Sequence, residues 1–298
     1  MTRIKMEADA TPARSRPPRA IDTQAPQALP QVPAYADTLD DGQFATTLAR
    51  GLEILRCFTP QDTLLGNKDL ALRTGLPKPT VSRLTYTLSR LGYLRAGPRQ
   101  RKYQLGSAVL SLSYPLLASI SLRQLARPAM NALADTIGGS VSMGIRDRLN
   151  VVYIETSRSR LPAAPQFSDV GLAHPMAGTS IGRAYLAACD TSERNAILNE
   201  IRVKTPEQYA RYADALRRSF DDYDRLGFCV CYDYTLPGIY GVGAPMKRRV
   251  NGEIVVFNCV VSCLSTRRAR MEKDIGPQLT AMLAMLETTL SRAEFTQD

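Results

Sequence analysis

The chain has 298 residues, enough for two domains of ordinary size, and a formal net charge of +10. Its six cysteines are scattered, and no secretory signal or long apolar run is present. These features exclude a membrane-spanning protein and a small disulfide-stapled secreted domain, so we expect a cytoplasmic protein with reduced thiols.

The positive charge is concentrated in one segment. Residues 44–106 hold 11 Lys/Arg against 3 Asp/Glu, whereas residues 107–298 hold 22 against 19. A local excess of this kind is typical of a surface that binds phosphate groups. The preceding residues, 1–43, contain six prolines and almost no apolar periodicity, which predicts a disordered leader.

A helix is expected over residues 44–58, and the sequence after it follows helix-turn-helix rules. Asn67 is expected to cap a short helix that ends at Gly75, and Pro79 suits the first position of the next helix. That second helix carries a single apolar stripe made of Val81, Leu84, Leu88 and Leu91.

Two short strands, 93–95 and 102–105, should flank a basic turn and form a wing. In such a domain the second helix enters the major groove while the wing contacts phosphates. The expected groove residues are Lys78, Thr80, Ser82, Arg83 and Tyr86, and the expected phosphate contacts are Arg99, Arg101 and Lys102. An ordinary helical hairpin with a solvated basic face is the alternative, but turn, cap, stripe and wing agree on DNA binding.

The second half alternates between helical and strand patterns. The pattern over residues 107–137 predicts a helical connector, which Pro115 should kink or break. Helices are expected at 179–188, 192–201, from a capping box at Thr205 to Gly227, and at 271–292. Strands are expected at 141–146, 151–156, 167–170, 228–232, and at 239–249 and 253–264 around the Asn251-Gly252 turn. Hairpins with helices around them predict an α+β fold with a mainly antiparallel sheet.

Four stretches carry a resemblance to a known family. ARGLEILRCFTP, LALRTGLPKPTVSRL, LGYL and YQLG resemble the N-terminal domain of IclR-type bacterial transcriptional regulators, and looser matches extend the resemblance to about residue 295. It implies a winged helix-turn-helix at 44–106, a helical linker at 107–121 and a GAF-like or profilin-like effector-binding domain at 122–298. It also implies a homodimer or dimer of dimers on a two-fold operator in double-stranded DNA, controlled by a small organic acid.

The same resemblance implies an effector site around the helix that begins near residue 179. The family usually has lysine where this chain has Arg183, and its acid-rich loop is reduced here to Asp233 between two tyrosines. Two phenol rings favour an aromatic or partly apolar ligand, such as an aromatic or other organic acid. The expected effector residues are Asp169, Thr179, Ser180, Ile181, Tyr232, Asp233, Tyr234, Val260 and Ser262.

Two alternative hypotheses about function rest on other residues of the C-terminal half of the chain. Residues 178–182 match the G-x-S-x-G motif of serine hydrolases, but the only histidine, His174, precedes Ser180, whereas that motif needs one downstream. A thiol- or metal-sensing regulator would use Cys229, Cys231, Cys259 and Cys263, although C-x-C within a strand is a poor chelate. We therefore predict a regulator that is not an enzyme, with no catalytic residue, metal or cofactor.

Overall fold

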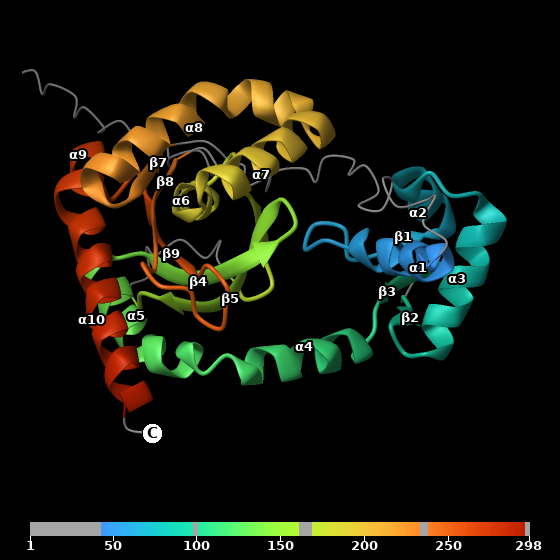
Figure 1. The fold of residues 1–298 in the computed structure, drawn as a ribbon. Helices are drawn as coiled ribbons and strands as arrows, with labels where there is room; N and C mark the ends of the chain where they lie inside the picture. Colours follow the sequence, from blue (N-terminus) through green and yellow to red (C-terminus); the bar gives the residue numbers. More distant parts are fainter. Residues whose placement is uncertain (1–42, 98–100, 161–168, 233–237, 296–298) are drawn as a thin grey trace, which may run out of the picture.

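The computed structural model describes residues 43–97, 101–160, 169–232 and 238–295, so the predicted leader lies outside the described residues. Figure 1 shows a small N-terminal domain and a larger C-terminal domain joined by a long helix, α4 (Ala108–Ser119). No helix in these ranges has both the length and the hydropathy that crossing a bilayer requires.

The N-terminal domain has three helices and a small antiparallel sheet. The helices are α1 (Thr46–Arg56), α2 (Asn67–Thr74) and α3 (Lys78–Arg90), and the sheet has the order β1 (Leu65–Gly66), β3 (Lys102–Leu105), β2 (Leu94–Ala96). Val81, Leu84 and Leu88 of α3 pack into a common core with Ile54, Leu65, Leu70 and Leu94. Leu91, predicted to belong to the same stripe, is the C-cap of α3 and is 60% exposed. The predicted helix-turn-helix and wing are confirmed, and β1 is a further strand that the sequence pattern did not indicate.

The start of α2 differs from the prediction by one residue. Gly66 is the N-cap, and its N–H donates to Asp69 Oδ2 at 2.9 Å. Asn67 is the first helical residue, and its Oδ1 accepts a hydrogen bond from the buried Thr85 of α3 at 3.2 Å. Asn67 therefore holds the two helices together and does not cap one of them. Gly75 ends α2 with φ +69°, as predicted for a left-handed C-cap.

The connector is interrupted later than Pro115. Pro115 lies inside α4, and the break before α5 (Leu122–Ile137) falls at Ile120 and Ser121. None of the residues of α4 is buried, so water can bind the carbonyl that Pro115 leaves without an N–H partner. At the break, Arg123 donates from Nε to Ile154 O and from Nη1 to Leu117 O, both at 2.7 Å, which fixes the end of α4 to the C-terminal domain.

The C-terminal domain contains a six-stranded sheet in which all neighbouring strands are antiparallel. Its order is β6 (Ala173–Pro175), β5 (Asn150–Arg158), β4 (Ser140–Asp147), β9 (Val256–Ser262), β8 (Ile239–Pro245), β7 (Cys229–Tyr232). The mainly antiparallel sheet is confirmed. The strand expected at 167–170 is not: its described residues, 169 and 170, are outside any strand, and β6 comes later. Asn251 and Gly252 form the predicted turn with positive φ, but β8 and β9 are shorter than expected.

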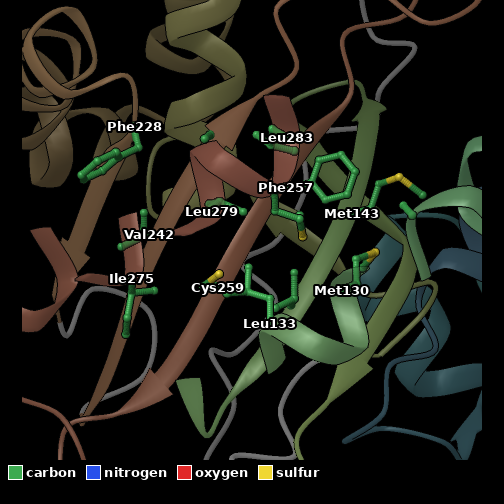
Figure 2. Close-up of a cluster of buried hydrophobic side chains, with 14 of the residues drawn as sticks. Met130, Leu133, Met143, Phe228, Val242, Phe257, Cys259, Ile275, Leu279 and Leu283 are labelled. Atoms are coloured by element: carbon green, nitrogen blue, oxygen red, sulfur yellow. The ribbon is translucent and has the colours of Figure 1, made fainter. Parts of the chain in front are cut away.

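Helices cover both faces of this sheet (Figure 1). One face packs against α6 (Ser180–Ala188), α7 (Thr191–Lys204) and α8 (Pro206–Leu226). The other packs against α5, the short helix α9 (Arg268–Arg270), the π-helix η2 (Met271–Ile275) and α10 (Gly276–Phe295). Figure 2 shows the second core, in which Met143, Phe257 and Cys259 of the sheet meet Leu279 and Leu283 of α10.

The predicted capping box at Thr205 is absent, although α8 starts and ends where expected. Thr205 Oγ1 donates to Ile201 O at 2.8 Å, and its side chain makes no cap contact with α8. Thr205 is also the C-cap of α7, so its hydroxyl binds the end of the preceding helix.

Candidate DNA-binding surface and effector site

The outer face of α3 has the exposure that groove binding requires. Lys78, Ser82, Arg83 and Tyr86 are exposed, Tyr86 to 67%, and Thr80 is half-buried. Val81, Thr85 and Leu88 face the core, so the helix presents its polar side outward. In the described parts of the chain, the side chains of Lys78 and Arg83 make no hydrogen bond or ion pair, which leaves both cations available to a ligand.

The acids of the N-terminal domain do not neutralise that surface. Asp62 pairs with Arg73 at 2.8 Å, Asp69 accepts from a backbone N–H, and Glu53 lies 3.7 Å from Arg56. All three acids lie on α1, on α2 or in the loop between them. The cations of α3 and the wing therefore form a positive surface that suits a phosphate backbone.

The wing carries two of its three predicted phosphate contacts within the described residues. Arg101 is exposed with φ +69°, and Lys102, the first residue of β3, is half-buried. Arg99 lies outside the described residues.

In the C-terminal domain the N-terminus of α6 lies directly on the sheet. Thr179 is its N-cap and accepts from Gly182 N at 3.1 Å. A Cβ built at Gly243 of β8 would lie 2.3 Å from Ser180 O, and one at Gly241 would lie 2.6 Å from Ser180 Oγ. Only glycine permits so close an approach, which brings the free N–H groups and positive dipole end of α6 to the sheet surface.

A set of polar side chains lies on the same face of the sheet, next to this helix end. Asn258 pairs in register with Gly243 and Ser142, and its Nδ2 donates to the Tyr153 hydroxyl at 2.8 Å. The hydroxyls of Ser142 and Thr156 lie 3.0 Å apart. Asn258 is 2% exposed, and its buried Oδ1 accepts no hydrogen bond from any described residue. Orphan polar groups beside a helix N-terminus can hydrogen-bond a small polar ligand.

Some predicted effector residues meet at this place. Thr179, Ser180 and Ile181 form the start of α6, and Val260 and Ser262 follow Asn258 on the same strand face. Asp169 is exposed and lies 3.2 Å from Arg158 of β5. Asp233 and Tyr234 lie outside the described residues.

Tyr232 does not lie beside the predicted effector residues at the start of α6 and on β9. It pairs with Tyr240 on the opposite face, where its hydroxyl donates to Arg268 O at 3.2 Å and lies 3.3 Å from Glu272 Oε1. Burial there raises the pKa of Tyr232 to about 12. Tyr232, expected from the sequence among the effector residues, therefore lies on the α10 side of the sheet, away from the start of α6.

The same face of the sheet carries a polar floor that was not predicted from the sequence, formed by Ser140, Ser142, Tyr153, Thr156 and Asn258. A signal was available in β4, where Ser140, Ser142 and Gly144 alternate with the apolar residues 141, 143 and 145. Serines at every second position of a strand buried on both faces indicate a polar interior surface.

The two alternative readings do not match the arrangement of their residues. His174 stacks on Tyr153 at 4.1 Å between ring centroids, and no hydrogen bond joins it to Ser180 in the described structure. The four thiols point to two faces: Cys229 packs with the α6 side and Cys259 with the α10 side. Burial raises the pKa of Cys231 to about 11 and also raises that of Cys259, so both stay protonated thiols. No group of three metal-ligating side chains occurs among the described residues.

A winged helix-turn-helix with an unneutralised basic face, joined to a sensor-like α+β domain, defines a DNA-binding regulator. Family comparisons agree: the IclR helix-turn-helix domain matches residues 47–98, and the C-terminal domain of bacterial IclR transcriptional regulators matches residues 115–292. The chain belongs to the IclR family of transcriptional regulators.

Individual relatives support this assignment. The transcriptional regulator TsaQ1/TsaQ2 of Comamonas testosteroni is 34% identical over 83% of this chain and 89% of its own length. The crystal structure of an IclR family regulator from Brucella abortus superimposes with a TM-score of 0.76 and 39% identity, covering 86% of this chain and 96% of that one. An IclR homologue from Microbacterium hydrocarbonoxydans, solved in complex with 4-hydroxybenzoate, shares the fold at 21% identity and a TM-score of 0.58, over 80% of this chain and 99% of that one.

Proposed function

We propose that this regulator binds a small aromatic carboxylate at the N-terminus of α6 and that binding changes its affinity for a two-fold operator. The observation that carries the proposal is the juxtaposition of that helix end with the buried, incompletely bonded Asn258. We further propose that residues 44–106 bind DNA, 107–121 act as linker and 122–298 bind the effector, in the cytoplasm, where the chromosome lies.

The chemistry of the site favours an acid with a polar ring substituent. The N–H groups of Ser180 and Ile181 have no partner within the helix and lie at the positive end of its dipole, which suits a carboxylate. Ser142, Thr156 and Asn258 offer hydroxyl and amide groups to the remainder of the ligand. The 4-hydroxybenzoate bound by the Microbacterium homologue has both features, which supports this class.

Self-association is proposed from the exposed apolar side chains of α1 and α4. Leu110, Leu112, Tyr114 and Leu116 of α4 are exposed to 72%, 64%, 71% and 53%, and Leu48 and Leu52 of α1 are also exposed. A cluster of exposed large apolar residues marks a partner surface. One recognition helix per chain implies a second copy on a two-fold operator, and a dimer of dimers uses the same unit twice.

The effector proposal is tested by thermal unfolding of the full chain with benzoate, 4-hydroxybenzoate, pyruvate and acetate. A ligand that binds only the folded state raises the melting temperature, and a concentration of about 100 times its Kd stabilises the fold by about 2.7 kcal/mol. We expect concentration-dependent rises with the aromatic acids and none with acetate. In Asn258→Leu the response to 4-hydroxybenzoate should weaken more than the response to benzoate, because the amide serves the ring substituent.

The outcome that contradicts the proposal is a set of equal responses to all four acids, or none to any of them. If Asn258→Leu melts too early to compare, Ser142→Ala provides the same comparison with a smaller change in volume.

A further inference from the structure

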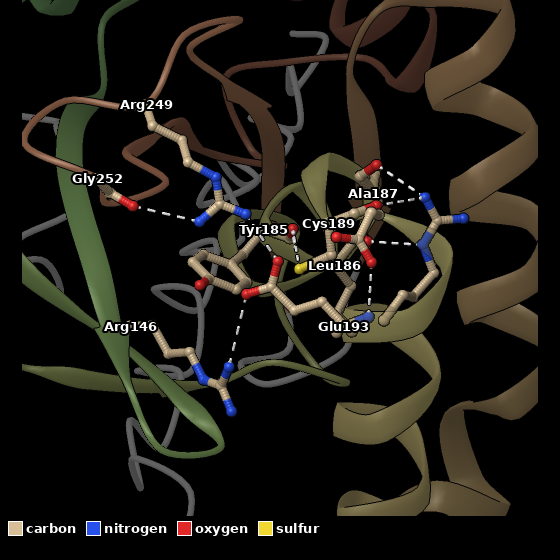
Figure 3. A network of polar contacts seen from close by, with 10 residues as sticks. Arg146, Tyr185, Leu186, Ala187, Cys189, Glu193, Arg249 and Gly252 are labelled. Carbon is tan, nitrogen blue, oxygen red and sulfur yellow. Dashed lines mark hydrogen bonds and ion pairs between the residues drawn. The ribbon is translucent and has the colours of Figure 1, made fainter.

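A network of charged side chains links the C-terminal end of α6 to the C-terminal end of β4 (Figure 3). Glu193, in the first turn of α7, accepts a hydrogen bond from Arg249 at 2.9 Å and lies 3.9 Å from Arg146 of β4. The neighbouring Arg194 donates to the carbonyls of Leu186, Ala187 and Cys189 at 2.9–3.0 Å. The C-terminus of α6 is thus tied to α7, and α7 is tied to β4.

The network continues to the DNA-binding domain. Arg146 Nε donates to Arg148 O at 2.8 Å in the turn between β4 and β5, where Arg148 has φ +55°. Arg148 Nη1 lies 3.9 Å from Glu53 Oε1 on α1. This ion pair joins the C-terminal domain to the N-terminal domain. In Figure 1 the turn between β4 and β5 points toward the N-terminal domain at a place separate from α4, the linker that also joins the two domains.

The crossing contact has the properties of one that opens easily. The ion pair is long, and the Arg148 side chain is 32% exposed, so solvent weakens the attraction. Arg148 Nε is buried, lies 3.6 Å from Asp147 Oδ1, and donates no hydrogen bond to a described residue. A buried donor without an acceptor costs free energy, so the turn is not held in this arrangement by a full set of hydrogen bonds.

We propose that the β4–β5 turn is a releasable latch on α1, and that the Glu53–Arg148 contact passes the state of α6 to the DNA-binding domain. This inference rests on the proposed effector site, which is at the opposite end of the same nine-residue helix. A displacement of α6 on binding moves its C-terminus, and with it Glu193, Arg146 and the turn. The latch is then a second connection between the two domains, besides α4. Its opening changes the spacing of the two winged helices in a dimer.

The test compares wild type with Arg148→Glu, the charge swap Glu53→Arg/Arg148→Glu, and a control, Arg225→Glu. Arg225 also forms a partly exposed ion pair, with Asp222 at 3.0 Å on α8, but contacts no residue of the network. A DNA duplex selected from a random pool by the wild type serves as operator and 4-hydroxybenzoate as effector probe. Probe binding is measured by calorimetry, DNA affinity with and without the probe by titration, and amide hydrogen exchange without either.

In Arg148→Glu we expect unchanged affinity for the probe and faster amide exchange in residues 46–56 and 147–150. The probe-induced change in DNA affinity, between about 5-fold and 150-fold in a coupled system, should fall to about 1-fold in this variant and return in the charge swap. Arg225→Glu should behave as wild type.

Wild-type coupling and wild-type exchange in Arg148→Glu would overturn the latch and leave α4 as the route between domains. If 4-hydroxybenzoate does not bind the wild type, the proposed effector class fails instead. The exchange data then decide on the latch alone: acceleration in Arg148→Glu that the charge swap reverses supports the contact, and no acceleration refutes it.

Discussion

Two glycines of β8 determine how closely α6 approaches the sheet, and they differ in what a side chain would meet. At Gly243 a Cβ would lie 2.3 Å from the backbone oxygen of Ser180, whereas at Gly241 it would meet the Ser180 hydroxyl at 2.6 Å. A backbone atom of a packed helix cannot move aside alone, but a hydroxyl can rotate. The position of the proposed anion site thus depends more strongly on Gly243.

We predict that Gly243→Ala lowers the unfolding free energy by about 1–3 kcal/mol, the usual cost of overpacking a core, and removes the thermal response to aromatic acids. Gly241→Ala should cost less and keep part of that response. Urea unfolding followed by circular dichroism measures the first effect, and ligand titration the second. Equal losses in the two variants would mean that the approach of α6 to the sheet is not limited by its backbone.

His174 makes the fold sensitive to acid. Its Nε2 is buried without a hydrogen-bond partner among the described residues, and burial lowers the pKa of the imidazole from 6.5 to about 4. Below pH ~6.5 the His174 imidazole is protonated in the unfolded chain, whereas in the folded chain it stays neutral until the pH falls to ~4. Folding stability from this group is therefore complete above pH ~6.5, falls as the pH drops to ~4, and is constant below that.

The lowered pKa corresponds to a loss of about 3 kcal/mol in the free energy of unfolding as the pH falls from ~6.5 to ~4. We predict that His174→Gln unfolds with a shallower pH dependence between pH 7 and 4.5 than the wild type, because the carboxylates are common to both chains. Urea titrations at half-unit pH intervals provide the two slopes. Parallel curves would show that the imidazole is not buried in its neutral form.

At the scale of the elements, α3 and the wing have different tasks in DNA binding. Arg83 is exposed on α3, the helix expected to enter the groove, and Lys102 lies on β3 of the wing. Contacts to base edges discriminate between sequences, whereas contacts to phosphates do not.

We predict that Arg83→Ala loses about 1–3 kcal/mol of discrimination between the operator and a scrambled duplex. Lys102→Ala should weaken binding to both duplexes equally and reduce the slope of log K against log salt by about one. Titrations at several salt concentrations measure both quantities. The assignment of groove and wing is wrong if Arg83→Ala weakens both duplexes alike while Lys102→Ala changes the preference between them.

The ends of helices and the turns were predicted well from the sequence, because each of these patterns is contained within a few residues. Gly75 and Gly227 end helices as left-handed caps, and Asn251-Gly252 makes the expected turn. The errors occur where a side chain has two local partners to choose from. Asn67 bonds Thr85 of the next helix, and Thr205 bonds the helix before it.

The candidate site was harder to predict because it depends on register between distant strands. Val260 and Ser262 were correctly placed on one face by alternation along a single strand. The side on which Tyr232 lies depends on its pairing with Tyr240, and a shift of one residue reverses the face. Asn258 joins Tyr153 across 105 positions of sequence, a contact that no local pattern encodes.

At the scale of the whole molecule, the linker helix α4 stands out because its large apolar side chains are mostly exposed in the single chain. It is apolar, yet none of its residues is buried in the single chain. A helix with this composition needs cover from elsewhere. The N-terminal domain beside it exposes Leu48 and Leu52, so two copies of the chain can bury both surfaces together.

We predict that Leu110→Glu/Tyr114→Glu, a pair one helical turn apart on α4, halves the mass of the particle in light scattering. The control is Leu264→Glu, which adds a charge at a leucine exposed to 81% in the C-terminal domain and should leave the mass unchanged. A monomer has a single recognition helix and loses the gain from binding two half-sites at once, so operator affinity should fall while affinity for one half-site stays the same. If the double variant keeps the wild-type mass, α4 is not the surface that joins the two chains, and its apolar residues must be covered in another way.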